Sequence, residues 1–262
     1  MLSRIQFNHQ DKTNYTADRK TILTSRFHFN INGFLIIENI FNKRTISNLN
    51  KYLQHNYLNN LNYQDSNYSK RVDHKRYMLN VELGGVFNDI NIFCNPIIYS
   101  IVEQFLGPGF VLNSFGAVIS LPGAKKQHTH RDHPYLFENI NEVINLPPYA
   151  VSLFIPLIKL DSMTGTTRVY KESHHINKVN LKKNYIDPVL DIGSCMLVDY
   201  RTLHAGLSNK SSHIRPILYF VYSKPWFRDS VNFKYFNPLS IGYEVYEKLP
   251  ANRRHLFSHL HK

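Results

Sequence analysis

The sequence predicts a mainly β protein with flanking helices, an α+β chain. Helix-like apolar periodicity is found in the first half of the chain and in one short C-terminal stretch. Between these segments, apolar runs of strand length alternate with turns rich in Gly, Pro, Asp and Asn. Helices followed by a strand-rich body are typical of a β-sandwich or barrel that carries helices on its outside.

The length and composition indicate an ordered globule. The chain has 262 residues, of which 43% are hydrophobic, so one domain or two small ones can bury a sizeable core. The two cysteines, Cys94 and Cys195, suffice for one bridge but not for a disulfide framework. The N-terminal residues lack the apolar core of a signal peptide, and no apolar run approaches the roughly 20 residues that span a bilayer. We expect a soluble, cytoplasmic protein.

The chain is strongly basic, with a formal net charge of +12 and a pI near 9.6. This balance favours anionic partners, such as nucleic acid, a phosphorylated or carboxylated ligand, or an acidic carrier protein. The alternative is a solvated basic surface without a specific partner. The basic residues are scattered singly and in pairs, which favours the solvated surface and argues against nucleic acid.

The first part of the chain contains one strand and one helix by these criteria. Residues 1–26 are polar and aperiodic, so we expect an irregular N-terminal arm. The stretch "NGFLIIENI" (32–40) predicts a turn followed by a strand. Apolar residues at helical spacing predict a helix over 45–58, with Thr45 as its cap. The polar residues 60–75 indicate a long surface loop.

The clearest helix is expected over 95–107. Pro96 suits its first turn, and Gly107 is a good stop signal. Beyond it, five apolar runs bounded by turn residues read as strands, at 110–120, 150–158, 166–170, 195–200 and 215–223. A short helix over 249–260 closes the chain.

The densest cluster of chemically active side chains is "QHTHRDHPYLF" (127–137). On an extended chain, His130 and Asp132 leave the same face, so one imidazole and one carboxylate can bind the same ion. His204 follows a strand-like run and offers a third ligand. Two histidines and one carboxylate form the facial triad of non-haem Fe(II) oxygenases, which leaves coordination positions open for substrates.

A zinc site built from His128, His130 and His133 is the competing interpretation of the same cluster. It leaves His204 unexplained, and it also leaves Arg215, which opens an apolar strand. An arginine that enters a core is costly unless it is paired, and its guanidinium group fits a carboxylate bidentately. A metal with open positions and a buried arginine together suit a 2-oxo acid. Its keto and C1 carboxylate oxygens would chelate the metal, and its far carboxylate would meet Arg215.

The ordered set His130, Asp132, His204 and Arg215 resembles the HxD…H…R pattern of the phytanoyl-CoA dioxygenase-like (PhyH) family of Fe(II)/2-oxoglutarate-dependent dioxygenases. "NGFLIIENIFNKRTISNLNKYL", "VSLFIPLIKLDSMTGTTRVYKESH" and "GSCMLVDYRTLHAGLSNKSSHIRPIL" are similar to further segments of that family. The resemblance covers residues 28 to about 227. It departs from the family at 171–174, where "KESH" replaces the usual "PGSH".

The resemblance implies a double-stranded β-helix (jelly-roll) core in a single domain over 27–262. It also implies Fe(II), with 2-oxoglutarate and O2 as cosubstrates and succinate and CO2 as products. Related halogenases replace the metal-binding aspartate by a small residue, so the retained Asp132 favours hydroxylation or another oxidation.

Four further residues are candidates for binding roles. Family members often place a polar residue near Gln127 that touches the cosubstrate, although a regular strand would turn this side chain away from the metal. Asn113, inside a strand, is a candidate for the same role, with a satisfied core amide as the alternative. Arg131 and Arg168 are candidates for binding an anionic group of the substrate, with a solvent-facing position as the alternative.

The expected activity is hydroxylation of an unactivated C–H bond in a small-molecule or natural-product substrate. An acyl-CoA or carrier-tethered substrate is the second candidate, and a non-catalytic basic binding module is the candidate from another class. Desaturation, ring formation or epimerisation would use the same iron site. The expected partner is a small-molecule substrate, with an anionic or carrier-tethered molecule as one option. We expect neither membrane nor nucleic acid as a partner.

Overall fold

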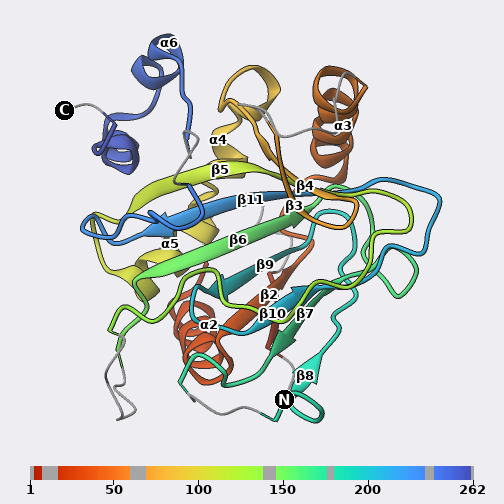
Figure 1. Ribbon diagram of the computed structural model, residues 1–262. Helices are drawn as coiled ribbons and strands as arrows, with labels where there is room; N and C mark the ends of the chain where they lie inside the picture. Colours follow the sequence, from red (N-terminus) through yellow and green to blue (C-terminus); the bar gives the residue numbers. More distant parts are fainter. Residues whose placement is uncertain are drawn as a thin grey trace.

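Two β-sheets form the body of the protein (Figure 1). The computed structural model describes residues 3–7, 17–59, 69–137, 146–175, 180–233 and 239–260. The larger sheet contains β1 (Arg4–Gln6), β2 (Phe34–Glu38), β3 (Ser69–Asp73), β4 (Arg76–Asn80), β5 (Val111–Ser120), β6 (Ala150–Pro156), β9 (Cys195–Asp199) and β11 (Arg215–Ser223). Its strand order is β1-β2-β9-β6-β11-β5-β4-β3. The smaller sheet contains β7 (Thr167–Tyr170), β8 (Tyr185–Ile186) and β10 (His204–Gly206), in the order β10-β7-β8.

The helices lie on the outer face of the larger sheet. They are α2 (Arg19–Asn32), α3 (Lys43–Leu53), α4 (Ile90–Phe93), α5 (Pro96–Leu106) and α6 (Tyr243–Glu247), with a turn of π-helix at Gln54–Leu58 and 3-10 turns at Gly85–Phe87 and Ala251–Phe257. Phe29 of α2 stacks on Phe105 of α5 with ring centroids 3.9 Å apart. Both rings belong to the large apolar cluster that the helices share with this face of the sheet.

Both faces of the central strands are buried, and the side chains alternate between them. On β11, Leu218 and Phe220 enter the cluster under the helices, whereas Ile217 and Tyr219 point the other way. A second cluster joins Ile217 to Val169 of the smaller sheet, so the two sheets face each other across an apolar layer. This arrangement is the expected jelly-roll core with helices outside.

The structure confirms most of the expected elements. The strands expected at 110–120, 150–158, 166–170, 195–200 and 215–223 are β5, β6, β7, β9 and β11, and the helix expected over 95–107 is α5. Asn95 caps α5, since its side chain accepts the N–H groups of Ile97 and Ile98. Gly107 ends the helix with φ of 81°, a backbone conformation that glycine adopts without strain.

Three expectations about the N-terminal third are wrong. The arm over 1–26 is not irregular, because Arg4–Gln6 adds a parallel strand beside β2 and α2 begins at Arg19 with Asp18 as its cap. Asn42 caps α3 in place of Thr45, so that helix begins two residues earlier. Residues 69–73 of the expected loop form the edge strand β3, and residues 60–68 lie outside the described residues.

Pairing with distant strands forms β1 and β3, whose sequences are short and polar, whereas the local caps Asp18 and Asn42 set the starts of α2 and α3. In the described parts of the chain, no helix combines the length and apolar character needed to cross a bilayer. The single-domain boundaries and the cytoplasmic location stay predictions.

Candidate metal centre

Backbone pairing brings the predicted metal ligands together. The N–H of His130 donates to the carbonyl of His204 at 3.0 Å, and the N–H of His204 donates to the carbonyl of His130 at 2.9 Å. This short antiparallel bridge sets the two imidazole centroids 4.5 Å apart. The N–H of Asp132 donates to the carbonyl of Tyr200 at 3.2 Å, which fixes the third residue beside the other two.

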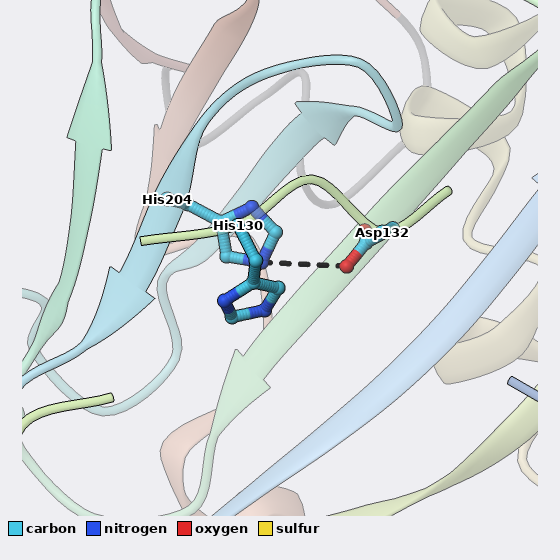
Figure 2. A group of neighbouring side chains, drawn as sticks. All are labelled: His130, Asp132 and His204. Carbon is cyan, nitrogen blue, oxygen red and sulfur yellow. Dashed lines mark ion pairs between the residues drawn. The ribbon is translucent and has the colours of Figure 1, made fainter. Parts of the chain in front are cut away.

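Each histidine ring is oriented by the backbone carbonyl two residues before it. The Nδ1 of His130 lies 2.9 Å from the carbonyl of His128, and the Nδ1 of His204 lies 3.0 Å from the carbonyl of Thr202. A carbonyl only accepts, so both rings carry the proton on Nδ1 and leave Nε2 as a lone-pair donor. Figure 2 shows His130 and Asp132, from one stretch of chain, and His204, from β10, gathered around one point, with the 3.3 Å contact between Nε2 of His204 and Oδ1 of Asp132 marked.

The three side chains form a metal-ligand set. Their ligand atoms all lie within 4.8 Å of one another, and they are the one such group of three or more found in the described residues. Two imidazole nitrogens and one carboxylate oxygen match the facial triad of non-haem iron sites. His128 and His133 do not join a metal-binding group, so the structure does not assemble the competing zinc site.

Hydrogen bonds hold the Asp132 carboxylate and its backbone. Ser152 on β6 donates its hydroxyl to Oδ2 of Asp132 at 2.8 Å, which leaves Oδ1 facing His204 at 3.3 Å. Asn232 donates to the backbone carbonyl of Asp132 at 2.6 Å and to the buried carboxylate of Asp229. Such partners of a metal ligand fix its orientation and support its affinity for the metal.

The electrostatics of the group favour a bound cation. Burial and the nearby His204 lower the pKa of His130 to about 4, so its imidazole is neutral near pH 7 and free to bind a metal. Burial alone would lower the pKa of His204, but the Asp132 carboxylate raises it. Burial alone would raise the pKa of Asp132, but the two imidazoles and the Ser152 hydrogen bond lower it. Asp132 is therefore an ionised carboxylate.

The triad opens into a cavity of about 730 Å³ between the two sheets. Apolar side chains of the larger sheet form part of its wall, among them Met78, Val118, Ile217 and Val221. The cavity is large enough for a small dicarboxylate together with part of a second molecule.

Arg215 lines this cavity and is 1% exposed. Its Nη1 donates to the carbonyl of Gly165 at 2.8 Å, and its Nη2 donates to the hydroxyl of Ser120 at 2.7 Å. No carboxylate among the described residues forms an ion pair with it. A buried guanidinium without a counter-ion is costly, so the part of the cavity beside Arg215 is suited to an anion.

A second buried arginine, Arg76, lines the same cavity and was missed by the sequence analysis. Ser120 pairs with Arg76 on β4 and with Arg215 on β11, so the three residues lie side by side across adjacent strands. Arg76 is 0% exposed, and its Nη2 donates to the carbonyls of Lys125 and Leu207, each at 3.1 Å. Burial lowers its pKa to about 10. Burial and the nearby Arg76 lower the pKa of Arg215 to about 9.

The signal for Arg76 was present in the sequence. Like Arg215, it opens an apolar run, "RYMLNV", and an arginine entering a core needs a partner. The preceding polar residues made the run look like the end of a surface loop.

The other predicted binding residues divide into two pairs. Gln127 lines the cavity, because the chain at 127–129 is not a regular strand, and its Oε1 accepts the N–H of Gly206 at 3.0 Å. A Cβ on Gly206 would lie 2.4 Å from Nη1 of Arg76 and 2.6 Å from Oε1 of Gln127, so the ends of both side chains would have to shift. Arg131 also lines the cavity, and its Nη2 donates to the carbonyl of Ser173 at 3.1 Å.

Asn113 and Arg168 do not line the cavity. The Nδ2 of Asn113 donates to the hydroxyl of Ser223 and to the carbonyl of Phe227, so it is the satisfied core amide that was the alternative. Arg168 forms two hydrogen bonds with Asp187, at 2.7 and 2.6 Å, and its guanidinium lies over a tyrosine ring. Local partners therefore occupy both side chains, and neither binding role is kept.

The sequence matches the family model described as Phytanoyl-CoA dioxygenase (PhyH) over residues 29–217. The match spans most of the chain. This protein belongs to the PhyH family. It is an Fe/2-oxoglutarate dioxygenase of that family and carries the facial triad His130, Asp132 and His204.

Solved structures share the fold of this PhyH-family protein. HygX from Streptomyces hygroscopicus, with nickel and 2-oxoglutarate bound, superposes with a TM-score of 0.62 at 13% identity, over 82% of this chain and 90% of HygX. SnoN, a non-heme alpha ketoglutarate dependent epimerase from nogalamycin biosynthesis, gives a TM-score of 0.62 at 13% identity, over 79% of this chain and 82% of SnoN. At this identity the likeness establishes the double-stranded β-helix fold.

Proposed function

We propose that the protein binds Fe(II) through His130, Asp132 and His204. It would use 2-oxoglutarate and O2 to hydroxylate an unactivated C–H bond of a small-molecule or natural-product substrate, with release of succinate and CO2. The observation that carries this proposal is that one cavity holds a complete facial triad and the buried Arg215, which forms no ion pair with a carboxylate of the described residues. A metal held by three protein ligands keeps positions open for a chelating oxo acid and O2.

The residues around the cavity suit the shape and charge of 2-oxoglutarate. Its distal carboxylate would lie against Arg215 and Arg76, with the Ser120 hydroxyl between them in the same row. Two guanidinium groups without a carboxylate partner repel each other, and a carboxylate between them relieves that repulsion. Gln127 would contact the cosubstrate from the side of Gly206.

Bound iron would supply the oxidation chemistry, and the chain supplies position and exclusion of water. Ser152 and Asn232 hold Asp132 so that a single carboxylate oxygen faces the metal position. The buried side chains of Tyr219 and Val221 keep one wall of the reaction space dry.

The size of the cavity and the ligands of two structural relatives support a natural-product substrate. HygX has been solved with hygromycin B bound, and SnoN has been solved with nogalamycin RO bound. These are small natural products, and a cavity of about 730 Å³ suits a ligand of that kind. SnoN is an epimerase, so a site of this fold supports outcomes other than hydroxylation, and product analysis must decide between them.

The direct test is Fe(II)-dependent formation of succinate from 2-oxoglutarate. We expect turnover in the wild type and its loss in His130→Ala and His204→Ala, since each change removes a ligand. His128→Gln is the matched control, because it removes a neighbouring cavity imidazole but keeps the backbone carbonyl that orients His130. Absence of both succinate and 2-oxoglutarate binding in Fe(II)-loaded wild type would contradict the proposal.

A further inference from the structure

The charged lining of the cavity is almost entirely cationic. Asp132 is the one carboxylate among the described lining residues, and it faces the metal position. Five cationic side chains line the same cavity: Lys70, Arg71, Arg76, Arg131 and Arg215. The charges that line a cavity affect which ligands bind in it, because a charged ligand must exchange its water for contacts with the protein.

The cosubstrate and metal do not balance this charge. Under the proposed function, the distal carboxylate of 2-oxoglutarate meets Arg76 and Arg215, and its other carboxylate meets the metal. Arg131 remains, together with Lys70 on the edge strand β3. Arg131 lies in the chain between the ligands His130 and Asp132, and its side chain lines the same cavity as theirs.

The Arg131 side chain is fixed in place but has no counter-ion among the described residues. One Nη2 hydrogen bond reaches the carbonyl of Ser173, and Cζ lies 4.9 Å from the centre of the Tyr135 ring. The Nε is buried without a hydrogen-bond partner in the described structure. No carboxylate of the described residues forms an ion pair with this guanidinium. The guanidinium group is therefore held in place, and it keeps N–H groups that can donate to a ligand.

We propose that Arg131 binds an oxyanion of the substrate, a carboxylate or a phosphate, and so places the substrate beside the metal. The apolar side chains of Tyr135, Val231 and Phe233 line the same cavity and would take the body of the molecule. The inference rests on the proposed function and adds the chemical class of the substrate, which is a small anion with an apolar or aromatic body.

The test uses a series of small molecules that differ in charge. Protein loaded with Ni(II) and 2-oxoglutarate, which cannot turn over, is titrated in a calorimeter with 4-phenylbutanoate, 4-phenylbutanamide and 4-phenylbutylamine, and separately with phenyl phosphate. We expect the wild type to bind at least one of the two anions about tenfold or more tightly than the neutral amide, and the amine least. The two anions distinguish a carboxylate site from a phosphate site.

Three variants separate Arg131 from the general basic charge. Arg131→Gln should remove the preference for anions, and Arg131→Lys should retain part of it. Arg44→Gln removes the same charge from an exposed position on α3 and should bind all four probes like the wild type. If Arg131→Gln does not fold, the binding of the four probes to Arg131→Lys and to the wild type still tests the role of Arg131.

Three results would overturn the inference. The first is that the amide or the amine binds as tightly as the anions or more tightly, the second is an anion preference that survives in Arg131→Gln, and the third is that neither anion binds. The initial titration of wild-type protein with 2-oxoglutarate separates the two proposals. If 2-oxoglutarate does not bind, the proposed function fails, whereas 2-oxoglutarate binding without a charge preference removes only the role of Arg131.

Discussion

His130 and His204 are cross-strand partners, and each donates its N–H to the carbonyl of the other at 3.0 and 2.9 Å. Residues far apart in sequence thereby acquire a fixed separation that side-chain packing alone would not impose. Each ring is then turned by a backbone carbonyl two residues earlier, so both Nε2 atoms face the same point. The metal site is thus built mainly from main-chain hydrogen bonds, which side-chain substitutions nearby leave in place.

Ser152→Ala should weaken metal binding without removing a ligand. The Ser152 hydroxyl donates to Oδ2 of Asp132 at 2.8 Å, and losing this bond frees the carboxylate to rotate. We expect the affinity for Co(II), measured by anaerobic titration of its absorption spectrum, to fall about 10- to 100-fold. Ser114→Ala is the matched control, because Ser114 is also buried but its hydroxyl has no hydrogen-bond partner in the described structure. Equal affinities in the two variants would show that Ser152 does not orient the carboxylate.

Arg76→Met should remove most of the stabilisation that 2-oxoglutarate gives to the metal-free protein. In the wild type, a dicarboxylate that binds between Arg76 and Arg215 offsets their repulsion, so the unfolding temperature should rise with its concentration. The measurement is thermal unfolding with and without 2-oxoglutarate in the presence of a chelator. Arg168→Met is the control, since Arg168 is paired with Asp187 outside the cavity. An undiminished rise in Arg76→Met would exclude Arg76 from the cosubstrate site.

Gly206→Ala tests the close approach of Arg76 and Gln127 to β10. The added methyl would lie 2.4 Å from Nη1 of Arg76 and 2.6 Å from Oε1 of Gln127, so both side chains must move. We expect 2-oxoglutarate affinity to fall about tenfold or more and the free energy of unfolding to fall by about 1–3 kcal/mol. Gly84→Ala, where the nearest atom to the added methyl lies at 3.7 Å, should change neither quantity measurably. Wild-type affinity in Gly206→Ala would contradict the proposed cosubstrate position.

The conformational stability should fall as the pH is lowered, partly because of His174. Its Nε2 lies 2.9 Å from the carbonyl of Asn30, and its Nδ1 is buried without a hydrogen-bond partner among the described residues. Burial lowers its pKa from 6.5 to about 4. Between these values the unfolded chain binds a proton that the folded protein does not. The contribution is therefore fully present above about pH 6.5 and is lost as the pH falls toward 4, at up to about 1.4 kcal/mol per pH unit.

Urea denaturation at several pH values measures this slope. His174→Gln should flatten it in the window from pH 6.5 to about 4. His55→Gln, which removes an imidazole from the exposed surface of the helical turn after α3, serves as the matched control. Identical slopes in wild type and His174→Gln would assign the acid sensitivity to other groups.

The sequence was sufficient for the fold class and the triad because their signals are local. Alternating apolar runs define strands such as β5 and β11, and the spacing of His130 and Asp132 places both side chains on one side of an extended segment. His204 and Arg215 could be added because the order of the whole set resembles the PhyH family. Arg215 was also indicated by its position at the start of an apolar strand.

The sequence was insufficient wherever a residue's role depends on a distant partner. Arg131 and Arg168 look alike in the sequence, yet Arg168 is neutralised by Asp187 from the next strand and Arg131 has no carboxylate partner in the described structure. Asn113 became a core amide because Ser223 and Phe227 lie within hydrogen-bonding distance of it. The pairing of Arg76 with Ser120 depends on the β4–β5 register, which no local pattern determines.

The most direct measurement of the central claim is an anaerobic titration of the Fe(II)-loaded protein with 2-oxoglutarate, followed by visible absorption. Chelation of Fe(II) by the keto and carboxylate oxygens of an oxo acid produces a charge-transfer band that free Fe(II) lacks. We predict this band in the wild type, its absence in His204→Ala, and its appearance only at higher 2-oxoglutarate concentration in Arg215→Ala. A wild-type protein that binds Fe(II) but never develops the band would contradict the account.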